Sequence, residues 1–189
     1  MSDYMSLPTD LPAPEDDGAA DHLAGTAMPH LELRSTGGRV VALDRLGAGR
    51  TVIYIYPMTG QPGVDLPDGW NAIPGARGCT PETCGFRDHH AELVVAGPTA
   101  VYGLSSQSTD YQAELVERLA LPFEVLSDPR HELADALELP TFTAGGQRLY
   151  KRMTLVVADG RIEHVFYPVF PPDEHAAQVL DWLSAHPAR

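Results

Sequence analysis

The chain has 189 residues, of which 43% are hydrophobic and 21% are charged, as in a globular protein with a buried core. Its formal net charge of −13 excludes the basic surface that nucleic-acid recognition needs, and it argues equally against an anionic membrane. No apolar run is long enough to span a bilayer, and no Lys or Arg precedes Arg34, as a secretory signal would require. We therefore expect a cytoplasmic protein without nucleic-acid or membrane partners.

The chain begins with a segment that differs from the rest. Residues 1–25 are acidic and contain three prolines, which is typical of a flexible or surface-wrapped arm. Apolar residues on either side of Gly37-Gly38 then predict a β-hairpin at 31–33 and 40–43. We expect an arm at 1–25 and a single domain at 26–189.

The remaining elements alternate between strands and helices. Residues Thr51 to Tyr56 are β-branched or aromatic, as expected of a buried central strand. Helix-start residues, a two-residue turn signal at Asp159-Gly160 and apolar patterns predict these further elements: a helix at about 80–94, a strand at 99–104, a helix around Leu115 and Leu119, a strand at 123–126, a helix at 129–137, strands at 153–158 and 161–166, and a final helix containing Ala176 and Leu183. This order predicts an α/β domain with a mixed central sheet flanked by helices.

Residues 58–78 form a long connection that is rich in Gly and Pro. Connections of this length without secondary structure are uncommon in compact domains and tend to serve a function. The connection ends directly before Cys79, so we expect it to border the functional site.

Cys79 and Cys84 are the only cysteines of the chain, and both lie at the start of a predicted helix. Free N–H groups and the helix dipole stabilise a negative charge there, so we expect a lowered pKa for the Cys79 thiol. In a reducing compartment, such a pair serves redox chemistry more often than structure.

The spacing of the pair limits the chemistry. On one continuous helix the two Cα atoms are about 8–9 Å apart, whereas a disulfide needs them within about 7 Å. A disulfide therefore requires either that the helix start unwinds or that Cys79 lies outside it. Two cysteines supply too few ligands for a zinc site, and we expect neither a metal ion nor a cofactor.

The run Gly78-Cys79-Thr80-Pro81-Glu82-Thr83-Cys84-Gly85-Phe86-Arg87-Asp88 resembles the Gly-Cys-Thr-x-x-x-Cys-x-Phe-Arg-Asp signature of one group of peroxiredoxins. This is the PrxQ, or bacterioferritin-comigratory-protein, group. Tyr56-Pro57, Gly103-Leu104-Ser105, Leu126-Ser127-Asp128 and the hairpin at 152–165 extend the resemblance over about residues 28–185. It implies a thioredoxin-like fold and an atypical 2-Cys peroxidase that reduces hydrogen peroxide or organic hydroperoxides.

The resemblance also implies roles for individual residues. The Cys79 thiolate would attack the O–O bond and become a sulfenic acid, and Cys84 would resolve it as an intramolecular disulfide. Thioredoxin or a similar dithiol protein would then reduce this disulfide. Arg152 would stabilise the thiolate and the developing negative oxygen, with Glu82 orienting it. Because the disulfide lies within one chain, we expect a monomer.

The chain departs from the family in one place. The family carries Pro-x-x-x-Thr-x-x-Cys, but here Ala76 takes the threonine position, and Pro57 lies 22 residues before Cys79. An insertion between Pro57 and Cys79 explains this, and Thr59 becomes the candidate hydroxyl for peroxide binding. Without it, main-chain N–H groups near Cys79 and Arg152 must hold the peroxide. We expect Trp70 and Ile73 to pin the insertion to the body, the alternative being an apolar rim for bulky hydroperoxides.

Two other functions are considered. The first is a redox sensor or disulfide-relay protein that uses the same thiol switch without efficient turnover, and the altered threonine motif favours it. The second is a structural thioredoxin-like domain with incidental cysteines, which the paired-cysteine motif disfavours.

Overall fold

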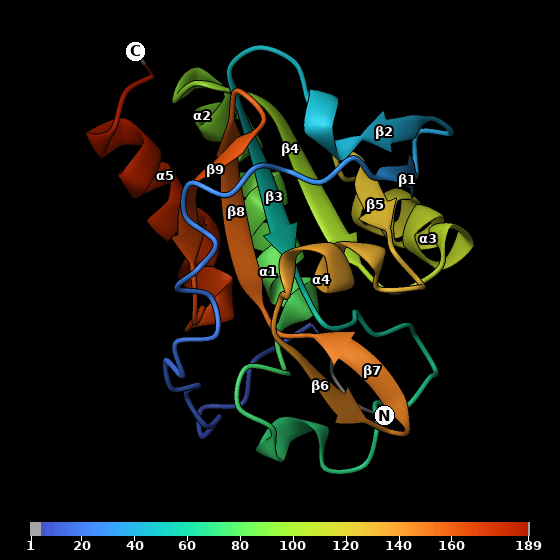
Figure 1. The fold of residues 1–189 in the computed structure, drawn as a ribbon. Helices are drawn as coiled ribbons and strands as arrows, with labels where there is room; N and C mark the ends of the chain where they lie inside the picture. Colours follow the sequence, from blue (N-terminus) through green and yellow to red (C-terminus); the bar gives the residue numbers. More distant parts are fainter. Residues whose placement is uncertain (1–4, 189) are drawn as a thin grey trace.

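The computed structural model describes residues 5–188 and is built around a mixed seven-stranded sheet (Figure 1). Its strands are β1 (Glu32–Ser35), β2 (Val40–Ala42), β3 (Arg50–Ile55), β4 (Pro98–Ser105), β5 (Val125–Ser127), β8 (Met153–Ala158) and β9 (Arg161–Phe166), in the order β2-β1-β5-β4-β3-β8-β9. The central strands β3, β4 and β5 run parallel, and the others pair antiparallel. The predicted mixed sheet and its N-terminal hairpin are confirmed.

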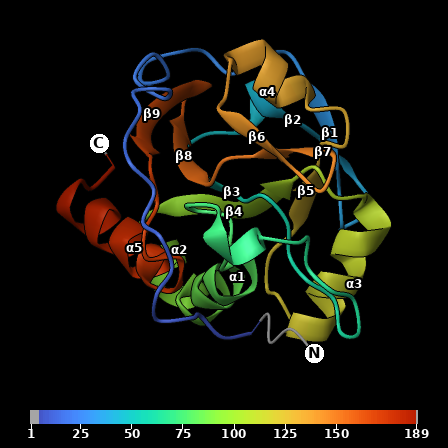
Figure 2. The same cartoon turned by 90° about the horizontal axis from the view of Figure 1, so that it is seen from below.

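Helices and the arm cover the two faces of this sheet (Figure 2). The helices are α1 (Cys79–Asp88), α2 (His90–Val95), α3 (Thr109–Leu119), α4 (Glu132–Leu137) and α5 (His175–Ala185). Side chains of β3 alternate between the faces: Tyr54 packs with α1, α2, α3 and α5, whereas Ile53 packs with α4, the β1–β2 hairpin and the arm. Among the described residues, no helix is both long and apolar enough to cross a bilayer.

Three predicted elements differ from the structure. The helix expected at 80–94 is two helices, because the backbone of His89 leaves the helical region at φ −92° and ψ 4°. The helix expected at 129–137 begins at Glu132, where the Asp128 carboxylate accepts the N–H groups of Glu132 and Leu133, both at 2.9 Å. The long connection is not wholly irregular, because Trp70–Ala72 forms a 3₁₀ turn.

A second, two-stranded sheet was not predicted. It pairs β6 (Thr141–Ala144) with β7 (Gln147–Tyr150) through a turn at Gly145-Gly146, and both glycines have positive φ. This β6–β7 hairpin extends below the main sheet and packs against the insertion at 58–78 (Figure 1). It therefore helps to place the chain that leads into Cys79.

The acidic N-terminal segment wraps around the outside of the domain (Figures 1 and 2). Leu23 is fully buried, and the Gly25 N–H donates to the carbonyl of Ile162 at 2.7 Å. Nearer its start, the carbonyl of Ser6 accepts a hydrogen bond from Arg77 at 3.1 Å. Residues 1–4 of the predicted arm and residue 189 of the predicted domain lie outside the described residues.

Candidate functional site

The site lies where the insertion meets the start of α1. Gly78 directly precedes the helix with φ 107°, a left-handed backbone conformation that favours glycine. Cys79 is the first helical residue, and its side chain is only 3% exposed. Its Sγ lies 3.5 Å from the carbonyl oxygen of Ala76, the residue at the family's threonine position.

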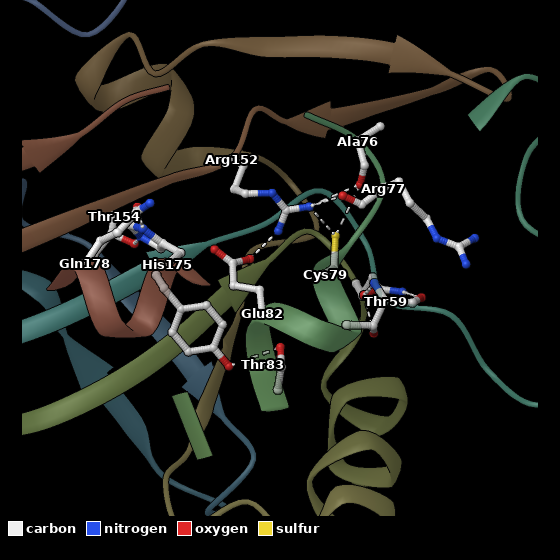
Figure 3. Close-up of polar contacts among 12 residues, drawn as sticks. Thr59, Ala76, Arg77, Cys79, Glu82, Thr83, Arg152, Thr154, His175 and Gln178 are labelled. Atoms are coloured by element: carbon white, nitrogen blue, oxygen red, sulfur yellow. Dashed lines mark hydrogen bonds and ion pairs between the residues drawn. The ribbon is translucent and has the colours of Figure 1, made fainter. Parts of the chain in front are cut away.

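Arg152, directly before β8, points at the Cys79 sulfur (Figure 3). Its Nη2 lies 3.2 Å from Cys79 Sγ and also donates to the carbonyl oxygens of Ala76 and Arg77, both at 3.2 Å. Its Nη1 forms a buried ion pair with Glu82, which lies in the first turn of α1. Removing one partner of a buried ion pair costs about 3–5 kcal/mol, because the remaining charge is then buried without compensation.

Electrostatics at the thiol differ from the sequence-based expectation. Burial raises the pKa of the Cys79 thiol, the Arg152 charge lowers it, and the net shift is upward. The prediction of a lowered pKa is therefore wrong for this closed arrangement, because loss of water outweighs the favourable charges. Burial likewise raises the pKa of Glu82 to about 7, against the opposing effect of Arg152. Burial lowers the pKa of Arg152, but Cys79 and Glu82 outweigh it and leave that pKa raised.

Thr59 is buried at the start of the insertion, and its hydroxyl is already engaged. Its Oγ1 donates to Gln107 Oε1 at 3.1 Å, and its N–H donates to the same oxygen at 2.9 Å. Gln107 Nε2 and the Tyr111 hydroxyl both donate to the Thr59 carbonyl. The main chain of the preceding residue, Met58, acts to lower the pKa of the Cys79 thiol. Gln107 thus holds the segment that borders the thiol.

Gln107 is a site residue that sequence reasoning missed. It lies two residues beyond the end of β4 at Ser105. The carboxyl ends of parallel strands form the usual site edge of an α/β sheet, and this position was the available signal. Nothing in the local sequence, however, indicates that its amide meets Thr59.

Cys84 lies further along α1 and is half-buried, and both cysteines are free thiols. Burial raises the pKa of the Cys84 thiol, and the nearby charge of Arg87 opposes this effect. Since α1 is continuous from Cys79 to Asp88, the structure shows the pair in its unlinked arrangement.

A buried polar cluster of Thr154, His175 and Gln178 lies beside the ion pair, to its left in Figure 3. His175 Nε2 lies 2.8 Å from the Thr154 hydroxyl, and its Nδ1 lies 3.1 Å from Gln178 Oε1. Burial lowers the pKa of His175 to about 4, so the ring is neutral at pH 7. Nδ1 then donates to Gln178 and Nε2 accepts from Thr154, which links β8 to α5 without a further charge.

The insertion is anchored mainly by Trp70. This side chain is 3% exposed and packs with Phe142 of the β6–β7 hairpin at a ring separation of 6.0 Å. Ala76, Ala144 and Leu149 are also buried in this small core, and the half-buried Ile73 packs against it. Trp70 therefore pins the insertion to the body, as predicted.

Comparisons with known proteins identify the family to which the chain belongs. The redoxin family model matches residues 23–180. The peroxiredoxin Bcp of Escherichia coli (strain K12) is 30% identical over 172 residues, which cover 86% of this chain and 96% of that protein. The chloroplastic peroxiredoxin Q of Oryza sativa subsp. japonica is 28% identical over 85% of this chain and 66% of its own length.

Solved structures with a similar fold are also peroxiredoxins. The crystal structure of peroxidoxin BcpB from Mycobacterium tuberculosis has a TM-score of 0.70 at 26% identity, covering 88% of this chain and all of that chain. A cysteine-to-serine mutant of PrxQ from Xylella fastidiosa has the same TM-score at 22% identity, with 87% and 98% coverage, and shows the shared thioredoxin-like fold. This chain therefore belongs to the redoxin family and, within it, to the PrxQ, or bacterioferritin-comigratory-protein, group of peroxiredoxins.

Proposed function

We propose that this peroxiredoxin is a thiol-dependent peroxidase in which Cys79 reduces hydrogen peroxide or an organic hydroperoxide. The observation that carries the proposal is the contact of 3.2 Å between Arg152 Nη2 and Cys79 Sγ at the start of α1. A cation beside the sulfur stabilises the thiolate and the negative charge that develops on the departing oxygen. Glu82 fixes the cation there through its ion pair.

The proposed reaction has three balanced steps. The Cys79 thiolate attacks the terminal peroxide oxygen, the O–O bond breaks, and the leaving oxygen takes a proton and departs as water or an alcohol. The Cys84 thiol then attacks the Cys79 sulfenic acid, which forms the disulfide and releases water. Thioredoxin or a similar dithiol protein supplies both electrons and both protons that restore the thiols, and becomes a disulfide itself.

Thioredoxin-coupled peroxide consumption tests this proposal. Wild type should turn over continuously, and Cys79→Ser should abolish turnover. Cys84→Ser should give one turnover that ends in a dimedone-reactive sulfenic acid, with poor recycling. Activity in Cys79→Ser would overturn the assignment of the attacking thiol.

The second candidate function is a redox sensor or disulfide relay. Its support is that the Cys79 thiol is buried and that the Thr59 hydroxyl bonds to Gln107. The same assay separates the two functions, because a sensor oxidises stoichiometrically and thioredoxin does not drive repeated peroxide reduction.

A further inference from the structure

A cavity of about 410 Å³ lies between the N-terminal arm and the insertion. The arm contributes Pro14, the insertion contributes Ile73, and the β6–β7 hairpin contributes Phe142. A Cβ added at Gly75 of the insertion would lie 3.6 Å from Pro14, so the arm and the insertion are in contact at this wall. The arm therefore supplies one part of the cavity wall.

Arg152 joins this cavity to the thiol site. The residue is 3% exposed and contributes to the cavity lining. Its Nη2 also lies 3.2 Å from Cys79 Sγ. A molecule in the cavity thus lies against Arg152, the residue whose guanidinium touches the reactive sulfur.

The size of the cavity indicates what it holds. Hydrogen peroxide is little larger than water, which occupies about 30 Å³ in the liquid. The volume of about 410 Å³ is more than ten times as large and falls in the range of small-molecule sites. Its occupant would therefore carry an organic group beyond the peroxide oxygens.

The charge of the lining indicates which organic group. Pro14, Ile73, Phe142 and Val169 supply apolar surface, whereas the exposed Glu15 and Asp17 bring negative charge to the arm side. The Lys151 ammonium lies 2.7 Å from Asp17 Oδ2, so an acid already offsets this cation. Glu82 likewise offsets Arg152. This lining favours an uncharged, apolar occupant over an anionic one.

We propose that the cavity binds the organic group of an uncharged alkyl or aryl hydroperoxide, and that arm residues 13–17 determine this selectivity. The proposal rests on the proposed peroxidase function. The Cys79 thiolate takes the terminal oxygen, the O–O bond breaks, and the organic alkoxide takes a proton and leaves as an alcohol. Since the family match begins at residue 23, this part of the site lies outside the redoxin region.

The test compares kcat/KM for cumene hydroperoxide and hydrogen peroxide, with the same reductant, in wild type and Ala13→Trp. Ala13 lines the cavity, so the indole should fill it, and the ratio of the two kcat/KM values should fall at least tenfold. Ala24→Trp, at an exposed arm position outside the lining, is the matched control and should keep the wild-type ratio.

A second variant tests the charge without filling the cavity. Glu15→Lys should raise kcat/KM for the anionic linoleic acid hydroperoxide at least threefold relative to cumene hydroperoxide. The cavity proposal would be overturned if each variant kept the wild-type ratio of kcat/KM values for its own pair of peroxides. In that case the proposed peroxidase function would still stand, provided that wild type turns over hydrogen peroxide. A wild type that turns over none of the three peroxides would overturn the proposed function, and this inference with it.

Discussion

The immediate surroundings of Cys79 have two opposing effects on the pKa of its thiol. Burial raises the pKa of its thiol because the thiolate loses its water, and the Arg152 guanidinium lowers it from 3.2 Å away. Glu82 adds to the upward shift through its own negative charge while holding Arg152 in place. The thiolate population therefore depends on Arg152 remaining in contact with the sulfur.

Arg152→Met should raise the pKa of Cys79 further, because burial then acts without an opposing cation. At any fixed pH below that pKa, the thiolate fraction falls about tenfold for each unit of upward shift. Thiolate absorbance and iodoacetamide alkylation against pH, in a Cys84→Ser background, measure this shift. We also expect kcat/KM to fall about 10²-fold or more.

Arg148→Met is the control for Arg152→Met, since Arg148 lies on the exposed face of β7 and pairs with Asp135 at 2.8 Å. It should leave the titration of Cys79 unchanged. An unchanged or lowered Cys79 pKa in Arg152→Met would contradict the electrostatic argument.

Gln107→Leu should impair peroxide reduction by releasing Thr59, because it removes the hydrogen bonds of the amide to the Thr59 hydroxyl, N–H and carbonyl. Displacement of a positioning group by about 1 Å can lower a rate about 10²-fold. Steady-state kcat/KM for hydrogen peroxide should fall in both Gln107→Leu and Thr59→Val. The double variant should lose no more than the worse single variant, whereas additive losses would show that Gln107 acts elsewhere.

Site residues that lie in a local sequence motif are predictable from the sequence, whereas a residue that acts through a long-range contact is not. The paired-cysteine run contains Cys79 and Glu82, and the late hairpin resemblance contains Arg152, so the sequence predicts all three as site residues. Gln107 acts through a residue 48 positions away in the chain, and no local pattern encodes such a contact. The net pKa shift of Cys79 also required the fold, because it depends on burial from several segments.

At the scale of elements, the proposed redox chemistry depends on a change in the structure of helix α1. Both cysteines lie on this one helix, and a disulfide between them requires Cα atoms closer than an intact helix allows. α1 also packs against the 3₁₀ turn at Pro172–Glu174 and against α5. Formation of the proposed Cys79–Cys84 disulfide would therefore break helical hydrogen bonds and part of this packing.

The oxidised protein should accordingly lose hydrogen-exchange protection at residues 79–88. Exchange measured by mass spectrometry on reduced and oxidised protein checks this, with the far half of α5 as an internal control. Equal protection of 79–88 in both forms would contradict the requirement for unwinding.

Gly78→Ala should destabilise the reduced protein. Its φ of 107° disfavours an L side chain, and an added Cβ would clash with Pro172 and lie 2.9 Å from Leu7 Cδ2. We expect a loss of about 1–3 kcal/mol in the free energy of unfolding, measured by urea denaturation. Gly38→Ala is the matched control, because φ there is 78° but no heavy atom lies within 4 Å of the added Cβ. An equal loss in both variants would show that contact with the arm and with Pro172 contributes nothing.

Errors in predicting elements also have physical causes. The helix-start residues Pro81 and Glu82 predict where α1 begins but not where it ends, so the predicted helix at 80–94 runs past the interruption at His89. The β6–β7 hairpin is short, and its stability comes from packing against Trp70 in the insertion. The Gly145-Gly146 turn was the local signal for it. In contrast, β8 and β9 match their predicted bounds because a strong turn separates two regular apolar strands.

At the scale of the whole molecule, the arm joins parts of the chain that are distant in sequence. Asp17 Oδ2 lies 2.7 Å from Lys151 Nζ, and Tyr167 donates to Asp17 Oδ1 at 2.7 Å. The composition of residues 1–25 predicted a flexible or surface-wrapped segment, but not where it lies. Its position depends on such tertiary contacts, which also bring Ser6 to Arg77 and Leu7 close to Gly78, directly before Cys79.

Asp17→Asn should loosen the arm and expose Cys79 more often. The hydrogen bonds from Lys151 and Tyr167 lower the pKa of the Asp17 carboxyl. The stability that the ionised Asp17 carboxylate contributes is therefore present above its ordinary pKa of about 3.9, and it is lost only as pH falls through the lower pKa of the folded state. The contact with Lys151 and Tyr167 is thus intact at pH 7.

The reactivity of Cys79 with the bulky reagent DTNB, measured in a Cys84→Ser background, tests this prediction. Cys79 should react a few-fold faster in Asp17→Asn than in the parent, and 1 M salt should likewise speed the reaction of the parent. Asp10→Asn removes the same charge from an exposed arm position outside the cavity lining and should react at the parent rate. Equal rates in all three proteins would mean that the arm does not control access to the thiol, and that the barrier to reagents lies in the insertion instead.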